Sequence, residues 1–274
     1  MHLRDLTTLT DFETVVGLER EIWGFSPGED TVPLAILAVS VKRGGILIGA
    51  FEGPRMVGFV YSLAAMKGGQ PTQWSHMLGV VEDCRGSGAG HRLKLAQRDQ
   101  ALARGFDLIE WTFDPLQAAN AHLNFHKLGV VVEEYVENIY GESTSPLHGR
   151  MPTDRFIAQW WIRRPHVERR LQSTGPLVRA ADVADAPSVN RTTTAGRWLA
   201  CEGFDLALTD RRLLVEIPVG FTEMLAGDPG LASAWRLATR EIFEHYLGRG
   251  YRAVDFFLDR ANRRGAYLLA QRED

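Results

Sequence analysis

The sequence has few cysteines and no long apolar run. Cys84 and Cys201 are the only cysteines among 274 residues, and they lie far apart. This pair suggests neither a disulfide framework nor a metal site, and it fits a reducing compartment. Residues 1–5 contain no apolar signal core, and the apolar stretch 32–41 is too short to span a bilayer. We therefore expect a cytoplasmic protein that does not enter a membrane.

Neither positive nor negative side chains are in large excess. The formal net charge is −3 at pH 7, with 24% charged and 45% hydrophobic residues. These values are typical of a soluble globular protein, and the balance of charge argues against a dedicated nucleic-acid surface. The length is sufficient for one large domain or two smaller ones.

The spacing of apolar residues predicts an α/β protein with a mixed sheet and helices on both faces. Helices are expected at 12–23, with Asp11 as its cap, and at 33–42, 90–104 and 115–128. Strands are expected at 46–51, 56–64, 73–81, 106–113, 130–139 and 155–162. The first two of these strands form a hairpin through residues 52–55.

The polar run 172–176 separates a predicted domain of residues 1–170 from a smaller C-terminal α/β domain of residues 175–274. In the second domain, residues 249–259 resemble residues 104–114, and each follows a predicted long helix. The second domain is therefore either a degenerate half-copy of the first or an unrelated unit of the same kind. After the expected strand 213–217, the loop has Pro218 and a single glycine, so we expect no anion-binding loop there.

The strongest pattern lies between residues 78 and 90. A predicted strand with Leu78, Gly79 and Val80 leads into a loop that opens a long helix. The loop consists of Arg85, Gly86, Ser87, Gly88, Ala89 and Gly90. Its glycines let the backbone approach a bulky anion, the free N–H groups of the helix start favour phosphate, and an arginine suits phosphate oxygens.

Three other interpretations of this loop fit the sequence less well. A Walker loop would end in Gly-Lys-Ser/Thr, which residues 90–92 do not supply. The spacing of the glycines is tighter than in a dinucleotide-binding fingerprint. A glycine-rich turn without a ligand is the third alternative, and the preceding strand and the arginine make it less favoured.

Together, the strand, loop and helix resemble the GNAT N-acyltransferase superfamily, whose signature Arg/Gln-x-x-Gly-x-Gly/Ala is met at residues 85–90. The resemblance covers about residues 1–164 and implies the GNAT fold. It implies acetyl-CoA or another acyl-CoA as co-substrate, without a metal. It also implies that acyl-CoA lies between two splayed parallel strands, ending near Val81 and Asp114. The main chain of residues 78–80 would pair with the pantetheine arm, and the loop amides would hold the pyrophosphate.

The helix after Asp114 matches the superfamily in part. Ala121 and residues 125–129 fit its Ala…Tyr-x-Lys-Leu-Gly ending, which implies cofactor contacts for Asn120 and Phe125. Phe125 stands where many members carry a tyrosine that protonates the leaving thiolate, and Ala118 where many carry asparagine. Asn124, with His122 close by, is then the candidate for a catalytic role in place of the tyrosine. A thiolate, whose thiol has a pKa near 8.5, can also leave without an acid.

His76 is the second predicted catalytic residue. It stands two residues before Leu78, on the same face of the strand by the period of two. The resemblance implies that it takes a proton from the amine, and a neutral imidazole suits that task. A structural histidine is the alternative. Asp114 either caps the next helix or orients His76 or the amine, and residues 29 and 30 either border the acceptor site or cap a helix.

These observations predict an N-acyltransferase that moves an acyl group to a primary amine of a small molecule such as an amino acid. Residues 76–80, 111–116, 120–122 and 152–156 resemble a two-part bacterial GNAT subgroup with members that succinylate amino acids. Arg155 would then bind a carboxylate. A protein-lysine acyltransferase and a non-catalytic acyl-CoA-binding regulatory protein are the alternatives. We expect the C-terminal domain to shape the acceptor site or to form a homo-oligomer interface.

Overall fold

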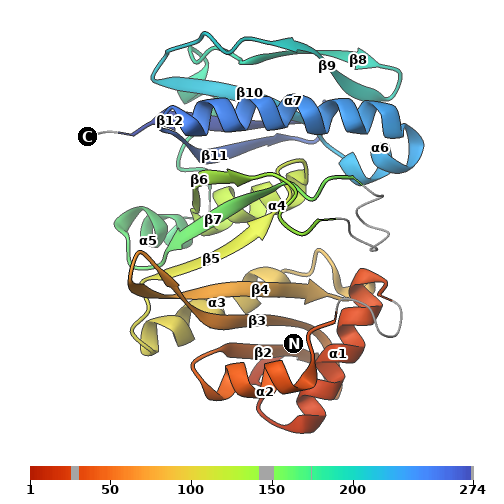
Figure 1. Ribbon diagram of the computed structural model, residues 1–274, viewed down its shortest axis with the longest axis vertical. Coiled ribbons are helices and arrows are strands. Elements are labelled where there is room, and N and C mark those ends of the chain that lie inside the picture. Colours follow the sequence, from red (N-terminus) through yellow and green to blue (C-terminus); the bar gives the residue numbers. More distant parts are fainter. Residues whose placement is uncertain (26–30, 142–150, 174, 273–274) are drawn as a thin grey trace. The chain divides into compact units, whose positions relative to one another are not determined.

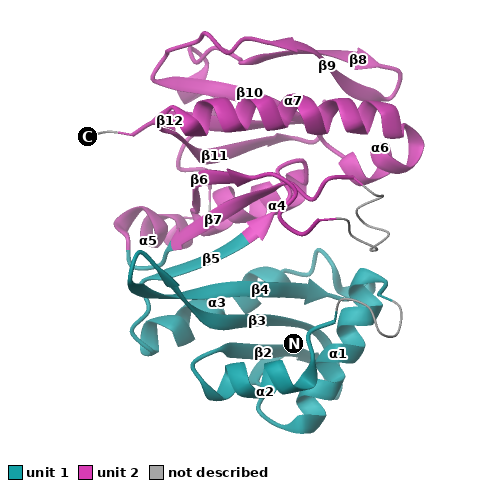
Figure 2. Ribbon diagram, in the orientation of Figure 1, with its two compact units in different colours: residues 1–111, 144–147, 161–163 teal, residues 112–143, 148–160, 164–274 magenta. Residues whose placement is uncertain are grey.

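The chain folds into two compact units (Figures 1 and 2). The computed structural model describes residues 1–25, 31–141, 151–173 and 175–272. Within these, unit 1 comprises residues 1–111 and 161–163, and unit 2 comprises residues 112–141, 151–160 and 164–272. The mixed α/β class is as expected. The units do not coincide with the predicted domains 1–170 and 175–274, and that division stays a prediction about chain segments.

Unit 1 is a sheet with helices on both faces. Its strands stand in the order β1 (His2–Asp5), β2 (Ile46–Glu52), β3 (Arg55–Lys67), β4 (Gln70–Val80) and the start of β5 (Leu108–Phe113). Neighbouring strands are antiparallel, except for the parallel pair β4–β5. Helices α1 (Leu9–Trp23) and α2 (Leu34–Lys42) pack on one face and α3 (Ala89–Ala103) on the other. A single 3-10 turn, Glu82–Cys84, connects β4 to the loop before α3.

The first helix begins earlier than the sequence suggested. Thr8, rather than Asp11, is its N-cap, and Asp11 completes a capping box from the third helical position. The side chain of Asp11 also pairs with Arg4 at 2.7 Å. The polar strand β1 was not predicted, because its stability comes from antiparallel pairing with the distant β2 rather than from an apolar pattern of its own.

Unit 2 has five principal strands in the order β7 (Arg155–Trp161), β6 (Val131–Val136), β11 (Tyr251–Asp259), β12 (Arg264–Gln271) and β10 (Arg212–Pro218). Strands β8 (Asn190–Ala195) and β9 (Trp198–Phe204) form a separate ribbon. The helices are α4 (Ala118–Ala121), α5 (Pro165–Gln172), α6 (Phe221–Gly227) and α7 (Pro229–Gly248), with a 3-10 turn at Ala180–Val183. After Ala121 the expected single helix widens into a π-helix, η2 (His122–Leu128).

An aromatic cluster forms the core of unit 2. Phe156 lies at its centre, with its ring centroid 5.6 Å from that of Phe113, 4.6 Å from Phe243 and 5.4 Å from Tyr267. Edge-to-face pairs of this kind each contribute about 0.5–1.5 kcal/mol beyond the area they bury. Because these rings come from β5, β7, α7 and β12, they join segments that are distant in sequence.

The C-terminal segment has its own topology. A strand, a long helix and a second strand are present as expected, namely β10, α7 and β11. However, β12 returns antiparallel to both strands and lies between them. Strands β10 and β11 therefore cannot form a splayed parallel pair. Among the described residues, no helix has the length and apolar character needed to cross a membrane.

Candidate functional site

One edge of β4 is open over its last six residues. Strand β4 pairs with β3 from Gln70 to Val80, but with β5 only at Gln73 and Trp74. Within unit 1, residues 75–80 therefore have a strand partner on one side alone. Backbone N–H and C=O groups require hydrogen-bond partners, so this edge is suited to an extended ligand that carries amide groups.

Gly79 allows α1 to lie directly on this strand. A Cβ atom at Gly79 would come within 2.8 Å of the side chains of Ile22 and Trp23. The glycine is thus required by helix packing, which the sequence alone did not reveal. Leu78 points to the opposite face, where its side chain lies 3.8 Å from the position of a Cβ on Gly90 of α3. The predicted cofactor contacts of residues 78–80 involve their main chain, which this packing leaves at the open edge.

The loop after β4 is built around two left-handed glycines. Gly86 and Gly88 have φ values of +80° and +85°, and a Cβ atom on either would meet no atom within 4 Å. Gly88 is also the N-cap residue of α3. Ser87 tightens the turn, since its hydroxyl donates to Cys84 O at 2.7 Å and accepts from Ala89 N at 3.4 Å. The first N–H groups of α3 have no acceptor within the helix, and the glycines leave the space beside them open.

The charges around this loop suit an anion. The Arg85 Nε lies 3.3 Å from Val80 O, at the C-terminal end of the open edge. The acidic side chain of Asp83 is offset by Arg55, whose guanidinium donates to it at 2.6 Å and 3.2 Å. The start of a helix carries a partial positive charge. Together these groups form a candidate anion-binding loop that begins where the open edge ends.

His76 sits on a β-bulge, and this corrects the expected face of its side chain. Tyr61 pairs with Met77 and Ser62 with Ser75, so His76 is the extra residue. An extra residue reverses the alternation of side chains. His76 therefore faces Tyr61, on the side of α1 and α2, at 6.1 Å between ring centroids, and not the side of Leu78. The ring keeps an exposed edge, while desolvation by the surrounding atoms lowers its pKa. The imidazole is thus neutral near pH 7.

A buried carboxyl group accompanies His76 on this side of unit 1. Glu19 of α1 is fully buried, and burial raises its pKa to about 7. Its Oε2 accepts from Val32 N at 2.8 Å, whereas its Oε1 has no partner among the described residues. Glu19 also raises the pKa of Tyr61, together with burial of that phenol. Sequence reasoning missed Glu19, although its position within the apolar stripe of residues 12–23 was a signal.

A buried lysine lies on the opposite face. Lys94 of α3 is 2% exposed, and its Nζ donates to Ser75 Oγ at 2.9 Å and to Gln97 Oε1 at 3.1 Å. The same Nζ lies 3.6 Å from the centre of the Trp111 ring. Burial lowers the pKa of this lysine well below its usual range. The group ties α3 to β4 directly behind the open edge.

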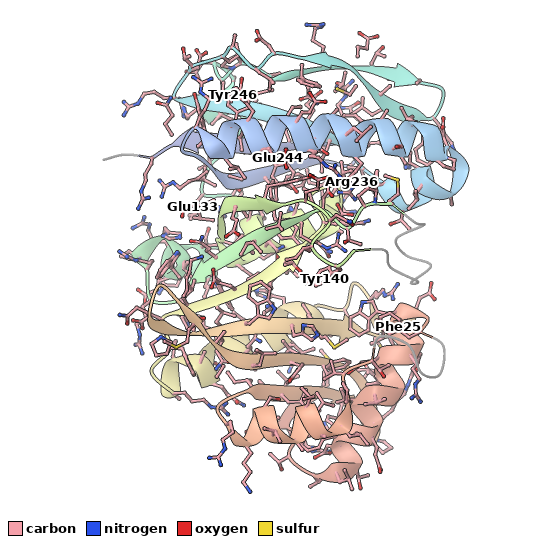
Figure 3. The ribbon with its side chains drawn as sticks, viewed as in Figure 1. Phe25, Glu133, Tyr140, Arg236, Glu244 and Tyr246 are labelled. Atoms are coloured by element: carbon pink, nitrogen blue, oxygen red, sulfur yellow. The ribbon has the colours of Figure 1, made fainter. Side chains whose placement is uncertain are left out.

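In unit 2, Asp114 follows β5 and is held by an arginine of α7. Arg236, which Figure 3 labels on α7, donates to both carboxylate oxygens of Asp114, at 2.8 Å and 2.6 Å. Burial alone would raise the pKa of Asp114, but the Arg236 guanidinium holds it below its usual range. Asp114 also accepts from Leu116 N at 2.9 Å. It therefore supports the turn that follows it, but it is not the helix cap that the sequence suggested, because α4 begins at Ala118 with Gln117 as its N-cap.

The residues expected on the next helix have different surroundings. Asn120 is exposed, whereas Asn124 is 3% exposed and its Nδ2 has no partner among the described residues. Phe125 is 1% exposed and packs against Phe113 and Tyr267. A ring this buried can meet a ligand only if its neighbours move. The cofactor contacts of Asn120 and Phe125 and the catalytic role of Asn124 stay predictions. Glu29 and Asp30 lie outside the described residues.

Arg155 belongs to a buried polar group in unit 2. It is 7% exposed, donates to Asp154 O at 2.9 Å, and lies with its guanidinium 5.6 Å from the centre of the Tyr140 ring. Burial lowers its pKa, while the nearby Asp114 opposes that effect. Asp154 itself accepts two bonds from Arg240, both at 2.9 Å, so its charge is already paired.

Comparison with known proteins identifies the fold. No family model and no curated protein matched the sequence. Among solved structures, an N-acetyltransferase from Staphylococcus aureus Mu50 matches with a TM-score of 0.50 at 13% identity, over 59% of this chain and 98% of its own. A protein assigned to the GNAT family from Desulfovibrio desulfuricans gives 0.45 at 16% identity, over 59% and 98%. The acetyltransferase-like protein yncA from Salmonella typhimurium, solved with its cofactor acetyl-CoA, gives 0.49 at 18% identity, over 60% and 95%.

This part of the chain has the GNAT acetyltransferase fold. The expectation drawn from residues 78–90 is thereby confirmed at the level of fold. The likeness covers about 59% of the chain, and the C-terminal segment is not clearly part of it. Within the GNAT-like part, the anion-binding loop and the open edge of β4 are the features that a nucleotide-linked thioester would use.

The first prediction concerns Gly90, which has an ordinary helical conformation and room for a side chain. Gly90→Val should leave α3 intact, because a Cβ there meets its nearest neighbour at 3.8 Å. If the loop holds a pyrophosphate, the added methyl groups should weaken acyl-CoA binding at least about tenfold, or ~1.4 kcal/mol. Calorimetric titration with acetyl-CoA measures the effect.

Gly17→Val is the matched control, since Gly17 lies in α1 with no atom within 4 Å of an added Cβ. It should bind acetyl-CoA as the wild type does. Unchanged affinity in a folded Gly90→Val protein would show that the pyrophosphate lies elsewhere.

The second prediction concerns the stability linked to Glu19. Its pKa is about 7 in the folded protein and 4.5 for the free group. A raised pKa means that stability is greatest below the unfolded value and is lost as the pH rises from about 4.5 to 7. The full effect is about 3 kcal/mol. Glu19→Gln should remove this dependence. The melting temperature of the variant minus that of the wild type should therefore increase from pH 4.5 to pH 8. A difference in melting temperature that is constant with pH contradicts this.

Proposed function

We propose that the protein transfers an acyl group from acyl-CoA to an amine. The observation that carries the proposal is the open edge of β4, residues 75–80, continuing into an anion-binding loop with Arg85 and two left-handed glycines. An extended arm with amide groups followed by a pyrophosphate matches this sequence of features. The GNAT acetyltransferase fold of this part of the chain supports the same ligand.

In the proposed reaction, the neutral His76 imidazole takes a proton from the incoming ammonium group. The free amine attacks the thioester carbonyl carbon, a C–N bond forms, and the C–S bond breaks to release the CoA thiolate. The attacking nitrogen loses its second proton to this thiolate, directly or through water, which gives the amide and CoA. N–H groups of the open edge are suited to stabilise the oxyanion. Because a thiol has a pKa near 8.5, the thiolate can leave unprotonated. Asn124 can donate a hydrogen bond but cannot supply a proton.

We further propose that the acceptor is a small molecule with a carboxylate beside its amine, such as an amino acid. Arg155 supports this part of the proposal, because a buried guanidinium next to an aromatic ring is a strong site for a carboxylate. Acetyl or succinyl groups are the candidate acyl groups. Arg236, by holding Asp114 in the same unit, keeps the surroundings of Arg155 ordered.

The third prediction tests the base. The pKa of His76 is lowered by desolvation, so the wild type should lose kcat/KM only as the pH falls below about 6.5. His76→Ala should be at least ~100-fold slower at pH 7. The defect should shrink toward pH 9, where more of the acceptor is already a free amine. Acetyl-CoA affinity should stay unchanged. A variant with the same pH–rate profile as the wild type would leave His76 as a structural residue.

The fourth prediction tests the acceptor. Release of CoA should be measured with acetyl-CoA and succinyl-CoA against the amino acids and, for each active one, its carboxamide. Active amino acids should be preferred over their amides, by about 1.5–3 kcal/mol for a lost charged hydrogen bond. Arg155→Met should remove the preference, Arg155→Lys should keep part of it, and Arg191→Met serves as the control.

Two outcomes separate the levels of this proposal. Equal rates with acids and amides contradict the role of Arg155 but leave acyl transfer standing. Binding of acyl-CoA without release of CoA in the presence of any amine contradicts the enzymatic function and favours a non-catalytic acyl-CoA-binding protein.

A further inference from the structure

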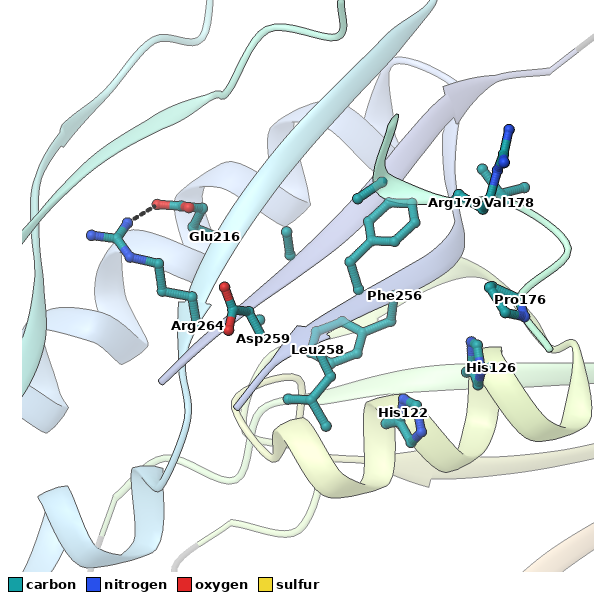
Figure 4. A pocket seen from close by; sticks show the side chains of 14 residues that line it. His122, His126, Pro176, Val178, Arg179, Glu216, Phe256, Leu258, Asp259 and Arg264 are labelled. Atoms are coloured by element: carbon teal, nitrogen blue, oxygen red, sulfur yellow. Dashed lines mark hydrogen bonds and ion pairs between the residues drawn. The ribbon is translucent and has the colours of Figure 1, made fainter. Parts of the chain in front are cut away.

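Unit 2 contains a cavity of about 520 Å³. It lies between the π-helix η2 and strands β11 and β12, and the segment 176–180 forms one wall (Figure 4). Its volume falls within the range of small-molecule sites. None of the loop residues 85–90 lines it, so the proposed acyl-CoA transfer does not account for it.

Most of the cavity wall is apolar. Phe256, Phe257 and Leu258 contribute from β11, Ala266 from β12, and Val178 from the segment after α5. Phe257 and Leu258 are partly exposed in this wall (Figure 4), whereas Phe256 is 1% exposed. An apolar body, such as an aromatic ring or a short alkyl chain, would be shielded from water against this surface.

One side of the cavity carries a pair of histidines. His122 and His126 stack on η2, with ring centroids 4.6 Å apart and planes at 16°. The Nδ1 atom of His122 is buried and has no hydrogen-bond partner among the described residues. Leaving a buried polar atom unpaired costs about 1–3 kcal/mol, so a ligand that supplies a partner would recover this energy. π-Helical turns are frequent at ligand sites.

The electrostatic surroundings of the pair are positive. Burial, followed by nearby cations, lowers the pKa of His122 to about 4. The groups that act on it are His126, Lys127, Arg170 and Arg260, and the cavity wall also includes Arg179, Arg264, Glu216 and Asp259. Within the wall, Glu216 pairs with Arg264 at 2.8 Å and Arg179 pairs with Asp182 at 2.8 Å, so these charges largely cancel. Asp259 accepts from the neutral Asn262 at 2.7 Å and keeps its charge. The attraction for an anionic group at His122 therefore comes from the cations that act on that ring.

We propose that this cavity binds a small amphipathic carboxylate, with its apolar body against Phe257 and Leu258 and its carboxylate at the His122–His126 pair. A carboxylate fits better than a phosphate. Two imidazole rings offer only a few donors, and most of the remaining wall is apolar and cannot satisfy a dianion.

Proton uptake follows from this arrangement. A carboxylate stabilises the imidazolium form, so the ligand raises the pKa of His122 and the complex takes up a proton. Affinity is then greatest at acidic pH and falls as the pH rises through the pKa of the histidine in the complex. A neutral ligand of the same shape lacks this dependence.

The fifth prediction uses 4-phenylbutyrate as the probe and 4-phenylbutyramide as its neutral counterpart. Each is titrated calorimetrically into the full chain in the presence of saturating CoA. The acid should bind at least about tenfold more tightly than the amide at pH 6, as expected for a charged hydrogen bond. This advantage should diminish at pH 8. The observed heat at pH 6 should vary with the ionisation enthalpy of the buffer, because a proton is taken up.

Two kinds of variant locate the site. Ala266→Phe fills the cavity from β12 and should abolish binding of both compounds. Val178→Trp fills it from the outer wall without altering a strand and should do the same if the first variant fails to fold. His122→Gln should still bind the amide but should lose the preference for the acid. Thermal unfolding of each variant confirms that it is folded.

Several results would overturn the proposal. One is that the wild type binds acid and amide equally, and another is that a folded cavity-filling variant binds them as the wild type does. The proposal is also wrong if the affinity for the acid does not fall between pH 6 and pH 8. It is wrong as well if neither compound binds at millimolar concentration.

Discussion

The unpaired edge of β4 is the constraint on which the GNAT-like part of the chain depends. A strand edge with free N–H and C=O groups is a liability unless something covers it. Here the edge begins after Trp74, where pairing with β5 ends, and it leads into the glycine loop at Gly86 and Gly88. The two features are continuous along the chain, so a single extended ligand with an anionic end would satisfy both. This continuity, rather than any one side chain, makes a CoA thioester the natural ligand.

Buried ionisable groups lie on both faces of this strand. Lys94 lies on the α3 face with Ser75, and Glu19 on the α1 face near Tyr61. Burial pushes each toward its neutral form. Apolar residues of similar size would be less costly to bury. What these groups provide is position. The hydrogen bond of Lys94 to Ser75 fixes α3 relative to β4, one residue before His76, and the hydrogen bond from Val32 to Glu19 fixes the segment before α2 relative to α1.

The sequence was sufficient for most elements of residues 12–162 and for the loop, but not for the irregularities or for strands β1, β8, β9 and β12. The glycines at 86, 88 and 90 after an apolar strand predict the loop from neighbouring residues alone, and the same is true of the turn at residues 52–55. The bulge at His76 depends on how β3 and β4 pair over distance, so period-two reasoning placed this side chain on the wrong face. The insertion of β12 between β10 and β11 likewise depends on long-range pairing. Local patterns cannot contain that information.

Two further features were hidden for a different reason. The π-helix at His122–Leu128 requires one extra residue per turn, and no propensity scale separates it from an α-helix. The partner of Asp114 is Arg236, which is 122 positions away along the chain. The turn after Asp114 could be expected from the Asp-Pro pair because it involves neighbours, although the helix itself begins only at Ala118. The ion pair was not visible because only the folded chain brings its members together.

The C-terminal segment is part of the packing around the end of β5. Arg236 neutralises Asp114, and the hydroxyl of Tyr267 donates to Pro115 O at 2.6 Å. Removing Arg236 would leave a buried carboxylate unpaired, which typically costs 3–5 kcal/mol.

The loop after β10 differs from the loop after β4, because a side chain occupies the space beside its glycine. A Cβ on Gly220 would meet the Arg263 guanidinium at 2.5 Å, so this side chain fills the position that stays open beside Gly86 and Gly88. Arg263 also bonds to Val219 O at 3.3 Å and Glu223 at 3.0 Å. With β12 between its two parallel strands and an arginine over its loop, the C-terminal segment has neither of the two features that a CoA thioester requires. The cavity of unit 2 at His122 is suited to a different, smaller ligand.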